Sequence, residues 1–287
     1  MSLPPEFTIG VMRADEVSLL DQWAADEGWN PGLHDLALAQ RLDPDAFIAL
    51  RQADNLAGAG TIYRHAPSFG FMGLFIMRKE LRGQGIGRDL WTWRRDALRA
   101  RLSPGGVIGM DGVFDMVPFY TRGGFRFAHR SLRYAGCSPG GARDPAVREL
   151  QGLPTAGLMD FDARHFPCAR STFMSAWIQQ PDTCAMTLTE NGEIKAFGVR
   201  RACRSGFKIG PLFGHSSALA DRLLGALLEG TAGAQIQIDI PEPNAAGLAL
   251  ARAWGMTECF GCARLYLGPE PALPLTQIFG VTSFEFG

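Results

Sequence analysis

The sequence predicts an α/β protein of two similar lobes, each with a mixed, mainly antiparallel sheet flanked by helices. Hydrophobic residues make up 46% of the 287 residues, which is enough for a sizeable core. Each half of the chain reads as hairpin, strand, helix, strand, helix, strand, which indicates an internal duplication. Residues 136–145 are rich in Gly, Pro and Ser and form the best linker candidate. We therefore expect domains at 1–135 and 146–287.

In the first half, the elements follow from hydrophobic periodicity and turn residues. Residues 14–27 carry apolar side chains at helical spacing, and the Gly- and Pro-containing turn 28–32 ends this helix. Asp54-Asn55 marks a tight hairpin between two strands. The expected strands are 7–12, 46–53, 56–63, 69–77, 107–110 and 125–134, and the expected helices are 14–27, 33–42, 85–102 and 117–122.

The second half repeats this order. Asn191-Gly192 is a strong hairpin turn. Ile236, Ile238 and Ile240 alternate with polar residues, as in a strand with one buried face. The expected helices are 161–179, 217–229 and 244–254, and the expected strands are 183–189, 193–202, 207–213, 235–240 and 259–267.

Charge, hydropathy and cysteine content narrow the function classes. The net charge of −1 supplies no bulk field toward nucleic acid or an anionic membrane, so we expect neither as a partner. No apolar run is long enough to span a bilayer and no basic-then-apolar leader is present, so we expect a cytoplasmic protein. The six cysteines are scattered, which favours reduced thiols. Cys259 and Cys262 form one C-x-x-C without a second pair or nearby His, so we expect buried side chains and no metal.

The most informative segment, residues 75–88, runs from an apolar strand through a Gly-rich turn into an amphipathic helix. Glycines permit positive φ and let the backbone approach a ligand closely. Successive N–H groups at a helix N-terminus form an anion site, for which a pyrophosphate is the natural ligand. The segment lacks the Lys-Ser/Thr of a nucleotide-hydrolysing P-loop and differs from the Rossmann fingerprint.

Two motifs resemble the GNAT superfamily of N-acetyltransferases. Arg82-x-x-Gly85-x-Gly87 is similar to the family's motif A, and residues 118–125 look like its helix with a Phe-Tyr pair followed by Gly-Phe. This resemblance covers residues 7–134. The second half resembles a degenerate GNAT lobe, because residues 211–215 lack the Gly-x-Gly cradle. The resemblance implies tandem GNAT-like lobes and an N-acetyltransferase that uses acetyl-CoA.

The resemblance also implies roles for individual residues. Tyr120 matches the tyrosine that protonates the departing CoA thiolate, and the alternative is a core aromatic at a helix end. The strand edge Phe75–Met77 would pair with the pantetheine amides. The predicted cofactor-binding residues are Phe75, Ile76, Met77, Arg82, Gly83, Gln84, Gly85, Ile86 and Gly87.

The base and the acceptor site are less well defined. The fourth strand offers no carboxylate, which departs from the family's commonest arrangement. Asp111 is the nearest candidate base, or else a turn former before Gly112, and deprotonation through water is a further alternative. The predicted acceptor-site residues, each with a structural alternative as an anchor, cap or solvated strand end, are Trp29, Asn30, Asp239 and Glu242.

Together these features predict acetyl transfer from acetyl-CoA to a primary amine of a small molecule by direct attack. The second lobe would shape the acceptor pocket. One alternative is a non-catalytic acyl-CoA sensor or regulatory protein, and another is a structural or partner-binding protein on the same fold. The sequence leaves the acceptor and the oligomeric state open.

Overall fold

The computed structural model describes residues 3–150, 152 and 154–287, so the first two residues of the predicted domain 1–135 lie outside the described part. The elements of the first half are β1 (Phe7–Val11), α1 (Ala14–Asp26), α2 (Asp35–Leu42), η1 (Pro44–Ala46), β2 (Phe47–Gln52), β3 (Asn55–Ala66), β4 (Phe69–Met77), η2 (Lys79–Leu81), α3 (Ile86–Arg101), β5 (Val107–Gly112), η3 (Phe114–Met116), α4 (Val117–Arg122) and β6 (Arg126–Cys137). Those of the second half are β7 (Val147–Glu149), α5 (Ala156–His165), α6 (Ser171–Trp177), β8 (Thr183–Glu190), β9 (Glu193–Ala202), β10 (Phe207–Gly214), α7 (Ser217–Leu227), β11 (Gln235–Pro241), α8 (Ala245–Ala253), β12 (Thr257–Leu267), η4 (Leu275–Gln277) and β13 (Ile278–Gly280).

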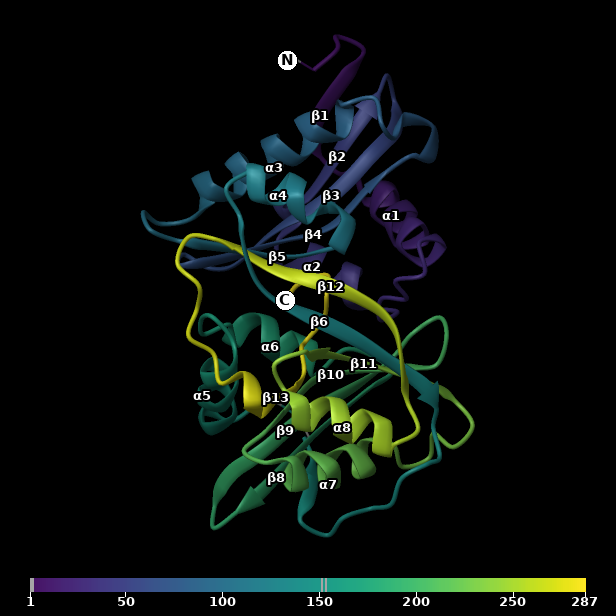
Figure 1. The fold of residues 1–287 in the computed structure, drawn as a ribbon, viewed down its shortest axis with the longest axis vertical. Coiled ribbons are helices and arrows are strands. Elements are labelled where there is room, and N and C mark those ends of the chain that lie inside the picture. The colour runs from purple at the N-terminus through teal and green to yellow at the C-terminus, as the bar shows by residue number, and fades with distance from the viewer. Residues whose placement is uncertain (1–2, 151, 153) are drawn as a thin grey trace.

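The two halves exchange their closing strands. Across the described residues the sheet order is β1-β2-β3-β4-β5-β12-β6-β11-β10-β9-β8-β7, with β13 beside β10. The late strand β12 pairs with β5 of the first lobe, and β6 pairs with β11 of the second. β12 and β6 also pair with each other, so they join the two lobes in the middle of the molecule (Figure 1). The predicted boundary between 135 and 146 places β6 in the first domain and β12 in the second, as the chain order does. In the sheet, β12 lies beside β5 of the first lobe and β6 lies beside β11 of the second.

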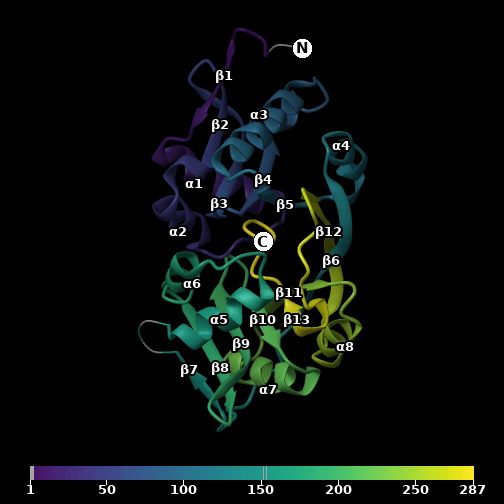
Figure 2. The same ribbon diagram turned by 90° about the vertical axis from the view of Figure 1, so that its left-hand side faces the viewer.

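Helices cover both faces of each lobe, and one core connects the lobes. Side chains of α3 and α4 pack on one face of the first lobe, and those of α7 and α8 pack on the outer face of the second. α1 and α2 lie on the opposite face of the first lobe, near α6 (Figure 2). This inner core contains Leu20, Leu36, Trp177, Phe213 and Phe286, all buried. Because it draws on both halves, the lobes cannot separate without exposing apolar surface.

The predicted mixed α/β architecture is confirmed, with differences in single elements. The helix expected at 161–179 is wrong: the chain forms α5 and α6, interrupted at Phe166-Pro167. Proline disfavours the helical conformation of the residue before it, and Phe166 is extended at φ −135° and ψ 152°. The short strands β7 and β13 were not predicted. No helix in the described ranges is long and apolar enough to cross a membrane.

Candidate active site

A Gly-rich loop connects β4 to α3 and has the backbone shape that the sequence predicts. Gly83 and Gly85 have φ of +78° and +85°, and a Cβ at either would meet nothing within 4 Å. The guanidinium of Arg82 donates to the carbonyl of Met77 at 2.9 Å and pairs with Glu27, the residue that follows α1. Arg82 therefore braces the loop against the end of β4.

The N–H groups of this loop are unused by the protein. In the described part of the chain, no acceptor pairs with the backbone N–H of residues 83–87. Gly85 is the N-cap residue of α3 and supplies no side-chain cap. Consecutive free N–H groups at a helix N-terminus bind anions well, because the helix dipole adds to their partial positive charge. The loop thus fits the diphosphate of a coenzyme A.

The neighbouring strands β4 and β5 separate at the level of this loop. Their parallel pairing ends at Met72 and Met110. Beyond that point β4 contains a bulge, where Leu74 has φ +52° and two residues face one residue of β3. Arg94 of α3 holds the bulge by donating to the carbonyls of Thr61 and Gly73, both at 2.6 Å. The bulge and the separation leave the β5-facing edge of Phe75–Met77 open to a ligand.

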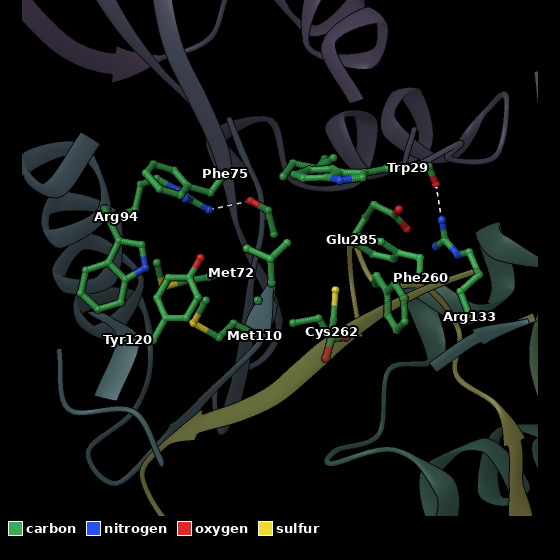
Figure 3. A pocket seen from close by; sticks show the side chains of 17 residues that line it. Trp29, Met72, Phe75, Arg94, Met110, Tyr120, Arg133, Phe260, Cys262 and Glu285 are labelled. Carbon is green, nitrogen blue, oxygen red and sulfur yellow. Dashed lines mark hydrogen bonds between the residues drawn. The ribbon is translucent and has the colours of Figure 1, made fainter. Parts of the chain in front are cut away.

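A narrow cavity of about 80 Å³, partly open to solvent, lies in the gap between β4 and β5. Figure 3 shows Arg94 and Tyr120 at one end, Trp29 and Glu285 at the other, and Met72, Met110 and Cys262 between them. The cavity therefore connects the side of the sheet that carries α3 with the interface between the lobes.

Tyr120 of α4 lines the cavity and is buried. Burial raises its pKa to about 12, and the nearby Arg94 opposes that rise. The phenol is therefore protonated at neutral pH and is able to donate a proton inside the cavity.

The corresponding place in the second lobe is filled by the chain itself. β10 and β11 pair in parallel only from Phe207 to Ile209 of β10, and β13 then pairs with Leu212 and Phe213 of β10. Helix α7 begins after Ser216, whose side chain accepts the N–H of Leu219. An occupied gap and a capped helix make this lobe a poor coenzyme site.

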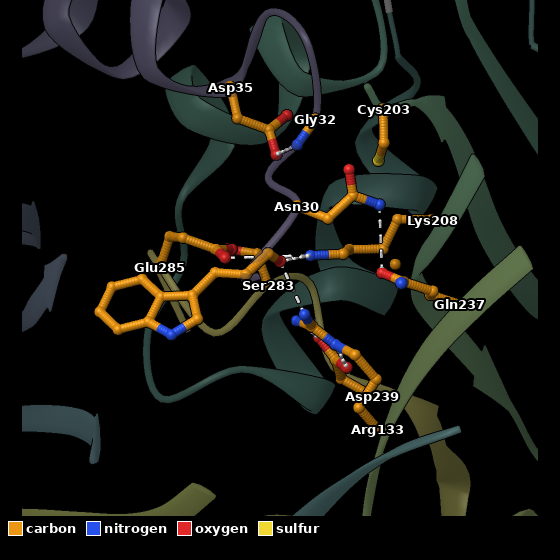
Figure 4. A network of polar contacts seen from close by, with 12 residues as sticks. Asn30, Gly32, Asp35, Arg133, Cys203, Lys208, Gln237, Asp239, Ser283 and Glu285 are labelled. Atoms are coloured by element: carbon orange, nitrogen blue, oxygen red, sulfur yellow. Dashed lines mark hydrogen bonds and ion pairs between the residues drawn. The ribbon is translucent and has the colours of Figure 1, made fainter. Parts of the chain in front are cut away.

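The end of the cavity at Trp29 and Glu285 borders a buried polar network (Figure 4). The carbonyl of Trp29 accepts from Arg133 at 2.6 Å and from Lys208 at 3.2 Å. Arg133 also donates to both oxygens of Asp239, at 2.7 and 2.9 Å. Burial lowers the pKa of Lys208, with a further contribution from Arg133, while Glu285 and Asp239 act in the opposite direction. The network fixes Trp29 as a wall of the cavity.

The remaining predicted site residues lie in different surroundings. Asn30 binds Ser205 and Gln237 of the second lobe and lies outside the cavity lining. Asp239 is occupied by Arg133, as described above. Glu242 pairs with Arg130 at 3.1 Å on the surface. The roles of these residues toward an acceptor stay predictions. In the structure, Asn30 binds residues of the second lobe, and Asp239 binds Arg133 of β6.

Asp111 lines the cavity, but both of its oxygens are bound. Arg264 of the exchanged strand β12 donates to them at 2.8 and 2.7 Å. Burial would lower the pKa of Arg264, yet Asp111 and Tyr266 raise it above its ordinary value. The pair joins β12 to β5, and Arg264 occupies one acceptor position on each oxygen of Asp111. Its predicted role as base is untested.

Comparison with known families identifies the fold. Two family models, each described as an acetyltransferase (GNAT) domain, match residues 15–138 and 158–280. The chain belongs to the GNAT acyltransferases and carries two GNAT domains in tandem. The bare N–H groups and the separated strands lie in the first of these domains.

Relatives of this tandem GNAT protein extend over nearly its whole length. It is 24% identical to the holothin acyltransferase of Pseudoalteromonas sp. (strain SANK 73390), over 95% of this chain and 92% of that protein. A putative acetyltransferase from Pyrococcus horikoshii has the same fold, with a TM-score of 0.85, 20% identity, and coverage of 100% and 98%. A tandem GNAT protein from the clavulanic acid biosynthesis pathway gives a TM-score of 0.61 at 15% identity, with coverage of 92% and 100%.

Several cavity residues of this GNAT protein were not predicted from its sequence. Arg94, Cys262, Phe284 and Glu285 line the cavity. Within the described residues, no group of three or more His, Cys, Asp or Glu is placed to hold a metal ion.

Proposed function

We propose that this acyltransferase transfers an acetyl group from acetyl-CoA to a primary amine of a small molecule by direct attack. The observation that carries the proposal is the run of free N–H groups at residues 83–87, next to an open strand edge and a buried phenol. The N–H groups would hold the diphosphate, and Phe75–Met77 would bind the pantetheine arm. This arrangement directs the thioester toward the cavity.

The cavity supports direct attack rather than a covalent acyl-enzyme. Burial raises the pKa of the Cys262 thiol well above its ordinary value, and Asp111 adds to the rise. Cys262 is thus a poor nucleophile, because the thiolate is the reactive form. A thioester is already activated, so an amine can attack it without an intermediate on the protein. Tyr120 then gives its proton to the departing sulfur.

The acceptor end favours a small molecule with a flat, apolar body. Trp29, Phe260 and Phe284 line this end of the cavity. Aromatic side chains bind flat rings by stacking and by edge contacts. The name of the Pseudoalteromonas relative, holothin acyltransferase, agrees with the transfer of an acyl group. We therefore expect an amine attached to a ring rather than a polybasic chain.

Thiol release from acetyl-CoA in the presence of a panel of ring-bearing amines tests this function. We expect an amine-dependent rate that falls by about 100-fold or more in Tyr120→Phe, because general acid catalysis contributes that much. Calorimetry should show coenzyme A bound equally well by both proteins. Binding without turnover of any amine would favour an acyl-CoA sensor, and a fully active Tyr120→Phe would eliminate the acid role.

A further inference from the structure

The last seven residues, 281–287, form a buried C-terminal tail between the two lobes. The strand β13 leads into the tail, and Val281 donates to the carbonyl of Asp239 at 2.8 Å. The tail then turns back on itself, since Ser283 accepts from the N–H of Phe286 and of Gly287, each at 3.0 Å. The tail is therefore held in a defined conformation beside the cavity.

Strand β4 is shaped to receive this tail. A Cβ on Gly73 would lie 2.0 Å from the carbonyl oxygen of Glu285, so only glycine allows the tail to pass so closely. His65 of the neighbouring strand β3 contacts the carbonyl of Phe286 at 2.8 Å. These contacts place the Glu285 side chain between Trp29 and Phe260 in the cavity wall (Figure 3).

The carboxylate of Glu285 is buried and only partly satisfied. The residue is 3% exposed. Its Oε1 lies 3.9 Å from the ammonium of Lys208, too far for a hydrogen bond, and its Oε2 has no partner among the described residues. Buried polar groups are normally hydrogen-bonded, and Glu285 lines the cavity, so its unpaired carboxylate indicates a donor that the chain does not supply.

Only two carboxylates line the cavity in the described part of the chain, and they differ in availability. Both oxygens of Asp111 are bound by Arg264. Glu285 has one oxygen free and lies at the acceptor end, away from Tyr120 (Figure 3). An ammonium group that enters beside Trp29 would meet Glu285 first.

We propose that Glu285 is the base that accepts a proton from the acceptor amine, a role that rests on the proposed function. The ammonium of the acceptor gives one proton to Glu285 and becomes a neutral amine. The lone pair of this amine then forms the C–N bond as the C–S bond of acetyl-CoA breaks. Tyr120 protonates the sulfur and regains a proton from the product nitrogen, while Glu285 releases its proton to solvent. The first transfer replaces two charges with two neutral groups, which the burial of Glu285 favours.

The surroundings of Glu285 contain charges of both signs. The groups that interact with it electrostatically are Lys208, Arg133, Asp111, Cys203 and Cys262. Asp239 neutralises Arg133 through its two hydrogen bonds, so Lys208 is the cation left to face Glu285. Lys208 lies near Oε1 of Glu285 and leaves Oε2 without a partner among the described residues.

Two amines, assayed with the protein of residues 1–287, separate a base role of Glu285 from a purely structural one. Benzylamine is protonated at pH 7.5 and needs a base before attack, whereas aniline is already neutral. With acetyl-CoA as donor, Glu285→Gln should lower kcat/KM for benzylamine by about 100-fold or more and for aniline by less than about tenfold. For benzylamine the variant's rate should rise about tenfold per pH unit as the neutral amine accumulates. Glu285→Asp should retain part of the activity.

The control is Glu193→Gln, the same change at an exposed carboxylate of the second lobe that pairs with Lys195, which should leave both rates unchanged. The affinity for coenzyme A and the midpoint of unfolding show whether the Glu285→Gln variant is still folded and still binds the coenzyme. Equal losses with both amines would overturn the base role while leaving the proposed function standing. No turnover of either amine by the unmodified protein would refute the proposed acceptor class, and the base role with it.

Discussion

Replacing Gly85 with glutamate places a negative charge in the proposed diphosphate site without a steric conflict. Gly85 has φ +85°, and a Cβ there meets nothing within 4 Å. The left-handed backbone costs a non-glycine residue about 1–2 kcal/mol of stability. The loop is exposed, so the new side chain extends into the space in front of the free N–H groups.

The expected loss of affinity follows from Coulomb's law. At about 6 Å, with an effective dielectric constant between about 20 and about 80, one carboxylate and two phosphate charges repel by about 1.4 to 5.5 kcal/mol. That range corresponds to an increase in the Kd for acetyl-CoA of about tenfold to ten-thousandfold. The penalty should shrink as ionic strength rises, because salt screens exposed charges.

Isothermal titration calorimetry with acetyl-CoA at low and high salt measures this effect. Gly85→Gln is the matched control, because it has the same backbone strain and nearly the same size without the charge. Gly230→Glu is a second control in the second lobe, at φ +73° with no atom near its Cβ. If Gly85→Glu binds acetyl-CoA as well as Gly85→Gln does, the diphosphate does not lie on this loop.

Two further predictions concern the cavity thiol and the pH dependence of stability. Cys262→Ala should keep amine-dependent turnover within a fewfold of the original, and mass spectrometry should find no acylated protein, whereas loss of turnover with an acyl adduct on the original protein would establish a covalent route. Burial lowers the pKa of His65 and of His129 to about 3, so both are neutral when folded and protonate near pH 6.5 when unfolded. The free energy of unfolding should therefore fall by about 2 kcal/mol for each histidine between pH 7 and pH 5. Urea unfolding at several pH values measures this fall. A free energy of unfolding that does not depend on pH, or a pH dependence that is unchanged in His65→Gln, would contradict it.

Local chemistry made the backbone shape of the Gly-rich loop predictable. A glycine with positive φ has a signature that does not depend on distant residues, and Gly83 and Gly85 adopt the predicted backbone. The strand before the loop and the helix after it were also visible in the hydrophobic period. The second lobe was recognised as lacking the Gly-x-Gly cradle, and the structure adds that β13 fills the corresponding gap.

Tertiary pairing explains what the sequence did not reveal. β6 and β12 occupy corresponding places in two similar halves, so neither strand's local pattern indicates which sheet it joins. Their exchange is secured by contacts such as the pair between Asp111 and Arg264, which are 153 positions apart. The role of Glu285 was hidden for the same reason: its burial depends on Gly73 and on the network around Lys208, which only the folded chain brings together.

A crystal structure of the complex with coenzyme A tests the central claim most directly. We predict that its diphosphate accepts hydrogen bonds from the backbone N–H groups of residues 83–87, with the pantetheine arm between β4 and β5 and its sulfur near Tyr120. A coenzyme bound in the second lobe, or one whose diphosphate lies away from the start of α3, would contradict the account.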